Sequence, residues 1–291
     1  MGIPAAGAHG GDGPAVAQAL GIDVLDLSQT LNPFAPDAAV LVAAHASVVS
    51  VYPDPHDATV QLAETIGVEP GRLLLTNGGS EAIALVAAEL GGGVASEPEF
   101  ALHPRGDGAV WRSDPHNPSG RLAEPDARVD VWDEAFYPLA TGRWHGGRPG
   151  VTVGSLTKLF ACPGLRLGYL IADDVERYAK RQSHWAVSSL ALASIPDLLA
   201  AADLVGWAAA VGRQRAQLVE MFENRGMEVD AAEAPWVLVR SVGLRDRLAP
   251  HGVVVRDCAS FAMPDWCRVA VADNDGLDRL AAALDAAGLR G

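Results

Sequence analysis

Two basic side chains lie in a stretch that is otherwise apolar or built from small residues, GSLTKLFACPGLRLGYLIA. Lys158 follows a predicted strand over 150–156, and Arg166 lies within a predicted strand over 165–172. Desolvation destabilises a lysine ammonium, which favours imine formation with a carbonyl carbon. A lone arginine in an apolar strand needs an anion, either a strand-end carboxylate or a phosphate. The stretch therefore predicts a reactive amine beside an anion site.

A glycine-rich turn supplies a second candidate anion site. The stretch TNGGSEA follows an apolar strand at 72–76, and Gly78, Gly79 and Ser80 open a helix. Backbone N–H groups at a helix N-terminus point outward and favour negative charge. A phosphate cup is expected here, with an ordinary helix cap as the alternative.

Two further polar residues follow in chain order. Asn117 lies in DPHNPSG, where a turn is the ordinary interpretation, and Asp133 ends the apolar strand of VDVWDEAF. An α/β sheet places its ligands beyond the strand ends, so Asp133 is a candidate site residue, with a helix or turn cap as the alternative. A lysine, an acid for a pyridinium nitrogen, a donor for a phenolic oxygen and a phosphate site fit pyridoxal 5′-phosphate.

Alternating strands and helices predict an α/β fold followed by a smaller domain. Predicted strands lie at 72–76, 128–136, 150–156 and 165–172, and predicted helices at 57–67 and 173–185. A long, mostly helical and alanine-rich stretch is expected over 196–225. After residue 225 a short set of strands and helices follows. We expect an N-terminal arm over 1–35 that contributes to the small domain and the active site, a large cofactor-binding α/β domain over 36–195, and a long linking helix with a small α+β domain over 196–291.

The order of the motifs resembles that of the fold-type-I pyridoxal-phosphate enzymes, in the histidinol-phosphate aminotransferase-like branch of the class I and II aminotransferases. HNPSG resembles the NNPTG of that family, WDEAF its VDEAF, and SLTKLFACPGLRLGY its lysine motif. The resemblance runs from about His9 to the end of the chain. It implies a large domain with a mostly parallel sheet of the seven-stranded type, here trimmed, and a small C-terminal α+β domain.

The resemblance also implies roles for individual residues. Lys158 would form the Schiff base, Asp133 would bind the pyridinium nitrogen and Asn117 the phenolic oxygen. His103 would stack on the cofactor ring, with Phe100 as a possible substitute. The cofactor phosphate would be bound by Gly78, Gly79, Ser80, Ser155 and Arg166, and by Tyr52 from a second subunit of a homodimer.

The N-terminal stretch AHGGDGPAVAQALGIDVLDLSQTLNPFAP resembles the start of threonine-phosphate decarboxylases of cobalamin synthesis. SLTK and VVVRDCASF point the same way. By this resemblance Arg268 would bind the substrate carboxylate, and His9, Asn32 and Arg256 would line the substrate-phosphate side. From the residues alone, Arg268 could equally be a sheet-edge charge and His9 an exposed loop residue.

The expected reaction is the decarboxylation of L-threonine O-3-phosphate to (R)-1-aminopropan-2-yl phosphate and CO₂. The first alternative is an aminotransferase that acts on histidinol phosphate or a similar amine, because the same residues support both reactions. The second is a degenerate homologue that binds the cofactor or a partner without turnover. Two short connections motivate it: 16 residues between Phe100 and Asn117, and 8 between Gly120 and Val129. A complete βαβ unit needs about 30 residues or more.

Composition narrows the partners. The formal net charge of −14 argues against nucleic acid or an anionic membrane as the main partner. Three cysteines without a CxxC pair fit a reduced cytoplasmic compartment. No apolar run reaches the length of a membrane span, and no cluster has metal-ligand spacing. We expect a cytoplasmic homodimer that acts on a small phosphorylated amino acid or amine, without a metal.

Overall fold

A six-stranded sheet forms the centre of the larger domain in the computed structural model, which describes residues 2–290. Its order is β2-β7-β6-β5-β4-β3, and only β7 runs antiparallel to its neighbours. The strands are β2 (Leu73–Asn77), β3 (Gly93–Val94), β4 (Val110–Ser113), β5 (Val131–Asp133), β6 (Val151–Ser155) and β7 (Leu167–Ile171). This confirms the mostly parallel sheet, in a form with six strands.

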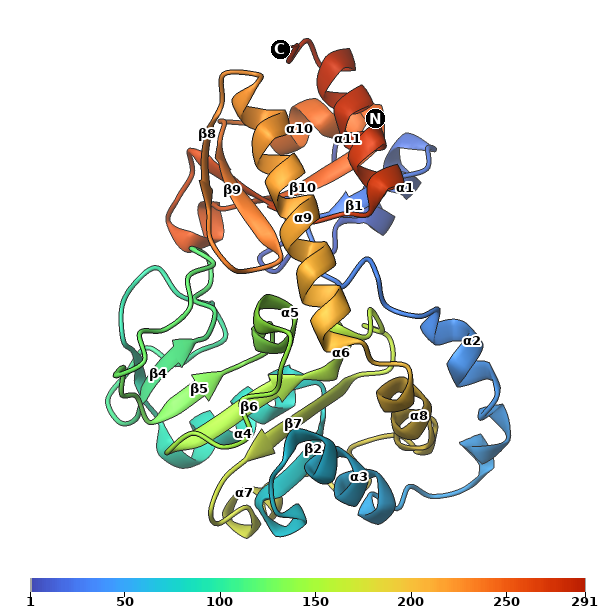
Figure 1. Cartoon of the computed structure of the whole chain (residues 1–291), viewed down its shortest axis with the longest axis vertical. Helices are drawn as coiled ribbons and strands as arrows, with labels where there is room; N and C mark the ends of the chain where they lie inside the picture. The colour runs from blue at the N-terminus through green and yellow to red at the C-terminus, as the bar shows by residue number, and fades with distance from the viewer. Residues whose placement is uncertain (1, 291) are drawn as a thin grey trace.

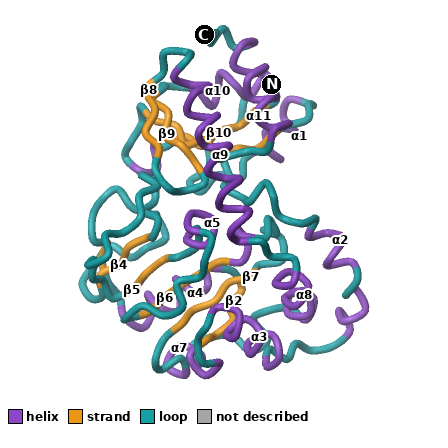
Figure 2. Tube along the Cα trace, viewed as in Figure 1, coloured by secondary structure: helices purple, strands orange, loops and turns teal. Residues whose placement is uncertain are grey.

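Helices cover both faces of this sheet (Figure 2). Successive strand residues point to opposite faces, so Tyr169 packs into one apolar cluster and Leu170 into another. The Tyr169 cluster includes residues of α3 (His56–Ile66) and α8 (Ser189–Ala200), and the Leu170 cluster includes α4 (Gly79–Leu90). The remaining helices of this domain are α2 (Ala38–Ala43), α5 (Tyr137–Thr141), α6 (Leu156–Leu159) and α7 (Glu176–Ala179).

The smaller domain is built on a five-stranded sheet of order β1-β10-β11-β9-β8. The N-terminal strand β1 pairs in parallel with β10, and the other pairs are antiparallel. The strands are β1 (Leu25–Leu27), β8 (Glu228–Ala231), β9 (Trp236–Arg240), β10 (Val253–Asp257) and β11 (Trp266–Ala270). The helices are α1 (Gly13–Leu20), α10 (Leu244–Leu248) and α11 (Asn274–Ala286). The predicted N-terminal arm therefore contributes a strand to the C-terminal domain.

The helix α9 (Leu204–Glu223) runs from the large domain into the small one (Figure 1). The stretch over 196–225 is mostly helical, as predicted, but it is divided between the end of α8 and the whole of α9, which meet at an angle of 81°. The Asp203 carboxylate ends the break by accepting a hydrogen bond from the N–H of Gly206 at 2.9 Å, which caps α9. No single helix within residues 2–290 is long and apolar enough to cross a membrane, although this bent pair passes on combined length and composition.

Two connections between parallel strands of the large domain consist of loops alone. Between β3 and β4, and again between β4 and β5, parallel strands are joined without a helix in the described chain. The first connection is held by Arg105, whose guanidinium donates to the carbonyl oxygens of Glu99 and Phe100, both at 2.9 Å. The trimming predicted from the sequence is thus present, and ordered loops replace the helices beside β4.

Candidate active site

A cavity of about 440 Å³ opens between the two domains, beyond the carboxyl ends of β5 and β6. Most of the predicted site residues line it. These are His9, Gly79, Ser80, Asn117, Asp133, Ser155, Lys158, Arg166, Arg256 and Arg268. Four predicted residues do not line it, namely Asn32, Tyr52, Gly78 and His103.

The N-terminus of α4 forms one end of the cavity. Arg166 donates from Nη2 to Ser80 Oγ at 3.0 Å and forms no ion pair with a carboxylate among the described residues. Gly78 has a φ of +78°, and a Cβ there would lie 2.2 Å from Arg166 Nη2. Arg166 itself precedes β7 instead of lying inside the strand as predicted, with a φ of +58°. Free N–H groups, a hydroxyl and an unpaired guanidinium fit a phosphate.

Gly168 shapes the same cup, although it was not among the predicted site residues. A Cβ at Gly168 would lie 2.4 Å from both Gly78 C and Gly79 N. Only a residue without a side chain lets β7 approach the turn this closely. The signal was present, because Gly168 is the second glycine of the quoted GLRLGY stretch.

Lys158 lies half-buried in α6, directly after β6. Burial, followed by the positive charges of Arg268 and Arg166, lowers the pKa of its ammonium to about 8. Near neutral pH the neutral, nucleophilic amine is therefore more populated than in an ordinary lysine.

Asn32 supports the backbone around Lys158. Its N–H donates to Lys158 O at 3.0 Å, and its side-chain Nδ2 donates to Leu159 O at 2.9 Å. The side-chain oxygen accepts from Phe34 N at 3.0 Å. This corrects the prediction of a substrate contact, because Asn32 is buried and its amide is engaged by backbone groups.

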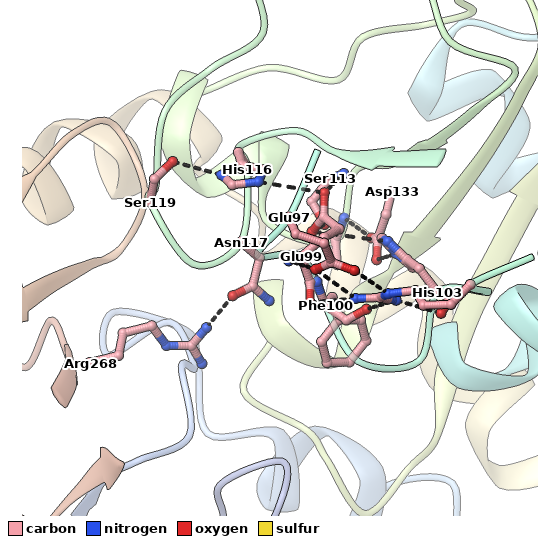
Figure 3. A network of polar contacts seen from close by, with 12 residues as sticks. Glu97, Glu99, Phe100, His103, Ser113, His116, Asn117, Ser119, Asp133 and Arg268 are labelled. Carbon is pink, nitrogen blue, oxygen red and sulfur yellow. Dashed lines mark hydrogen bonds and ion pairs between the residues drawn. The ribbon is translucent and has the colours of Figure 1, made fainter. Parts of the chain in front are cut away.

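Asp133 ends β5, is only 8% exposed and points into the cavity. Its Oδ1 accepts a hydrogen bond from Ala135 N at 3.0 Å, and its Oδ2 lies 3.0 Å from His103 Nε2 (Figure 3). The His103 side chain is completely buried, so it cannot stack on a ring in the cavity. Phe100, the predicted substitute, lines the cavity instead, with its ring centroid 5.6 Å from that of His103.

Asn117 and Arg268 meet across the domain boundary. The Arg268 guanidinium donates from Nη1 to Asn117 Oδ1 at 2.7 Å (Figure 3) and lies over the Trp236 ring, 4.7 Å from its centroid. The Asn117 NH₂ group donates to no other group in residues 2–290. Burial, followed by the charge of Arg256, lowers the pKa of Arg268 to about 9. The uncompensated arginine therefore favours an anion in the cavity.

Arg256 lies directly opposite Arg268 in the β10–β11 pair. Its guanidinium donates to the carbonyl oxygens of Ala8 at 2.9 Å and His9 at 3.2 Å, and lies 4.5 Å from the centroid of the Phe261 ring. Both arginines are 3% exposed, and neither forms an ion pair within the described part of the chain. Two adjacent buried cations without carboxylates are costly unless an anion binds between the domains.

A second charged group lies behind Asp133. Arg148 pairs with Asp114 and, through Nε at 2.8 Å, with Glu134, and its guanidinium lies 4.2 Å from the centroid of the Trp132 ring. Burial raises the pKa of Glu134 to about 7, against the opposing effect of Arg148. These carboxylates are already partnered, which leaves Asp133 as the acid that faces the cavity.

Tyr52 lies on the surface, 76% exposed, with its ring centroid 4.7 Å from that of Trp185. Val49, Val51 and Trp185 are also more than half exposed. The predicted contact of Tyr52 with a cofactor phosphate cannot form within one chain in this arrangement, and it stays a prediction about a second subunit.

One cavity thus combines an amine of lowered pKa, a buried carboxylate, an amide donor and a phosphate cup. These groups match the aldehyde, ring nitrogen, phenolic oxygen and phosphate of pyridoxal 5′-phosphate, so the residues present fit that cofactor. The model of the aminotransferase class I and II family matches residues 101–284. The chain belongs to this family of pyridoxal-phosphate-dependent enzymes.

Curated and solved relatives agree with this assignment. The chain is 26% identical to a histidinol-phosphate aminotransferase of Dechloromonas aromatica over 336 aligned positions, which cover 94% of this chain and 93% of that protein. Because the chain has only 291 residues, the alignment contains gaps, in keeping with the trimmed connections.

Two solved structures share the fold. Histidinol-phosphate aminotransferase from Sinorhizobium meliloti, in complex with pyridoxal 5′-phosphate, superposes with a TM-score of 0.77 at 18% identity and covers 94% of each chain. L-threonine-O-3-phosphate decarboxylase from Porphyromonas gingivalis gives a TM-score of 0.73 at 21% identity, over 89% of this chain and 98% of that one. At these sequence identities the two structures show that the fold is shared.

Proposed function

We propose that the protein decarboxylates L-threonine O-3-phosphate to (R)-1-aminopropan-2-yl phosphate and CO₂, a reaction that would supply the side arm of cobalamin. The observation that carries the proposal is the pair of buried arginines, Arg256 and Arg268, without carboxylate partners. A substrate with both a carboxylate and a phosphate has one anionic group for each of the two arginines. His9 lies beside Arg256 at the cavity wall and would contact the same phosphate.

The bound cofactor would supply an electron sink for the pair released when a bond to the substrate Cα breaks. Arg268 would hold the substrate carboxylate and set which Cα bond breaks, since orientation decides between loss of CO₂ and loss of a proton. Asp133 would hold the ring nitrogen, and Asn117 would donate to the phenolic oxygen. Lys158 Nζ would deliver a proton to Cα, so that one proton replaces the departing CO₂ and the products balance.

Transamination of histidinol phosphate or a similar amine is the second candidate. The curated relatives support it, since the matches with histidinol-phosphate aminotransferases extend over most of the chain. The same arginines could bind the phosphate of the amine and, in the second half-reaction, the carboxylates of 2-oxoglutarate. A third possibility, cofactor binding without turnover, is motivated by the helix-free connections beside Asn117.

A product assay separates these candidates. The cofactor-loaded protein is incubated with phosphothreonine and, separately, with histidinol phosphate, with and without 2-oxoglutarate. CO₂ and the amino-propanyl phosphate should appear from phosphothreonine without 2-oxoglutarate, and Lys158→Ala should abolish them. If glutamate forms, and forms only with histidinol phosphate, the protein is an aminotransferase and the decarboxylase proposal fails. If the protein is yellow but forms no product from either substrate, a homologue without turnover is favoured.

We also propose that the protein works as a homodimer. The exposed apolar group of Val49, Val51, Tyr52 and Trp185 supports an interface on the large domain, because contiguous apolar surface of this kind is typical of subunit contacts. In such a dimer Tyr52 would reach the cofactor phosphate bound by the second subunit.

A further inference from the structure

Glu99 is a buried carboxylate to which the proposed reaction assigns no role. It is 3% exposed and lies in the loop between β3 and β4. Its Oε1 accepts hydrogen bonds from Phe100 N and Ser113 Oγ, both at 2.8 Å, and its Oε2 accepts from Ser113 N at 2.9 Å. All three donors are neutral, so no arginine or lysine neutralises this carboxylate by direct contact in the described chain.

Two imidazoles face Glu99 from opposite sides (Figure 3). His103 Nδ1 lies 4.0 Å from Oε1, and His116 Nε2 lies 3.9 Å from Oε2. Both nitrogens are buried and have no hydrogen-bond partner in the described residues. Glu99 is therefore the centre of a group that reaches Asp133 through His103, and the loop carrying Asn117 through His116.

The contacts of His103 constrain its protons. Its Nε2 lies 3.0 Å from Asp133 Oδ2, and a carboxylate accepts hydrogen bonds, so Nε2 carries a proton. A neutral ring would then turn the lone pair of Nδ1 toward the Glu99 carboxylate. At 4.0 Å in a buried site that arrangement is repulsive, whereas an N–H at Nδ1 is attracted.

We propose that Glu99 is a positioning residue that keeps a proton on both ring nitrogens of His103. The imidazolium then lies between two carboxylates, Glu99 and Asp133. It fixes the rotamer of Asp133 and offsets part of its negative charge at the oxygen beside the cavity. The proton positions concern the protein without cofactor, and only their effect on the ring nitrogen of pyridoxal 5′-phosphate rests on the proposed function.

Nitrogen-15 NMR of histidine-labelled apoprotein tests the proton positions directly. The chain has 8 histidines, and the His103 signals are assigned by their loss in His103→Gln. At pH 7 both His103 nitrogens should show shifts of protonated imidazolium. Glu99→Gln should convert one of them to the shift of an unprotonated nitrogen. An unprotonated nitrogen in the native protein would overturn the proposal, whether or not any variant folds.

Glu97→Gln is the matched control, since Glu97 lies in the same loop, pairs with Arg105 at 2.7 Å and accepts from Glu99 N at 2.9 Å. Its side chain is 59% exposed and forms no hydrogen bond or ion pair with either imidazole in the described residues. Glu97→Gln should leave the His103 shifts unchanged. Equal changes in both variants would mean that loop order, and not the Glu99 charge, sets the state of His103, which would also overturn the proposal.

A second readout uses cofactor affinity, followed by the visible absorption of added pyridoxal 5′-phosphate. Glu99→Gln should weaken binding about tenfold, the size expected for one hydrogen bond to a charged group. Glu97→Gln should change it by less than about twofold, because exposed ion pairs contribute little. If the NMR result holds while no variant or native protein binds the cofactor, the proposed function fails and the proton assignment stands.

Discussion

Lys158, Arg166, Arg256 and Arg268 gather at one cavity in a chain whose formal net charge is −14. Several arginines elsewhere pair with acids, as Arg148 does with Asp114 and Glu134. The cavity arginines have no such partner in the described chain, so the site attracts anions and disfavours a charged lysine. The lysine and its arginine were predictable, because cofactor chemistry fixes their spacing within one short stretch.

The lowered pKa of Lys158 makes a prediction about pH. Because the neutral amine attacks the cofactor aldehyde, the rate of cofactor capture by apoprotein should rise with pH and reach half its maximum near pH 8. Arg268→Met removes a positive neighbour, so it should raise the lysine pKa and move the midpoint to higher pH. Stopped-flow absorbance measures both profiles. A native midpoint near the ordinary lysine pKa of about 10.4 would contradict the account.

The directions of the His103 and Asn32 side chains could not be predicted from the sequence. Both are polar residues near motif positions, yet their side chains contact Asp133 and the Leu159 backbone behind the cavity wall. Which face a loop residue presents depends on the path of the loop. In this chain that path follows from the helix-free connection between β3 and β4, and from the packing of the N-terminal arm, neither of which leaves a local pattern.

At the scale of elements, the apolar strands were predictable because they are buried on both faces. β2, β6 and β7 all lie within or close to the expected ranges. The helix predicted over 173–185 is limited to α7, and Arg177 within it and Arg181 just after it both pair with Glu89 of α4. These ion pairs favour the shorter helix over the longer one that the spacing of apolar residues predicted. The Asp203 cap separates α9 from α8. Strand β4 was missed, since VWRS is too short to give a pattern.

The close approach of β7 to the phosphate cup allows a prediction about cofactor binding. Gly168→Ala would place a Cβ 2.4 Å from Gly79 N, so the cup must open. Affinity for pyridoxal 5′-phosphate should fall about tenfold or more, whereas affinity for pyridoxal, which has no phosphate, should change little. Absorbance titrations give both constants.

Gly164→Ala is the control for this change, because a Cβ there meets nothing within 4 Å. It should leave both affinities as they are in the native protein. A Gly168→Ala protein that lost pyridoxal and pyridoxal 5′-phosphate binding equally would argue against a phosphate site in the cup.

For the whole molecule, the cavity depends on both domains. Asp133 ends a strand of the large sheet and Asn117 lies in the loop after β4. Arg256, Arg268 and the arm that carries His9 come from the small domain. The division into a large α/β domain and a small one was predictable from the change of pattern after the long helices. The contribution of the N-terminal arm to the small domain was also expected, but the pairing of β1 with β10 was not predictable, because it brings together residues more than two hundred positions apart.

The exposed Tyr52 group gives a prediction for this scale. Light scattering should find a dimer, and Trp185→Glu should shift it toward monomer by placing a charge in the apolar group. Tyr52→Phe should keep the dimer but release pyridoxal 5′-phosphate several-fold faster, since it removes only a hydroxyl. A native monomer that retains the cofactor would refute the role of Tyr52.

The central claim is that the cavity binds pyridoxal 5′-phosphate through Lys158, and the sequence makes its test simple. The chain has two lysines, Lys158 and the exposed Lys180. Borohydride reduction of the cofactor-loaded protein, followed by peptide mass spectrometry, should place the reduced cofactor on the peptide that carries Lys158. Lys158→Ala should abolish this label and the yellow colour, and Lys180→Ala should preserve both. A label on Lys180, or none on a protein saturated with cofactor, would contradict the account.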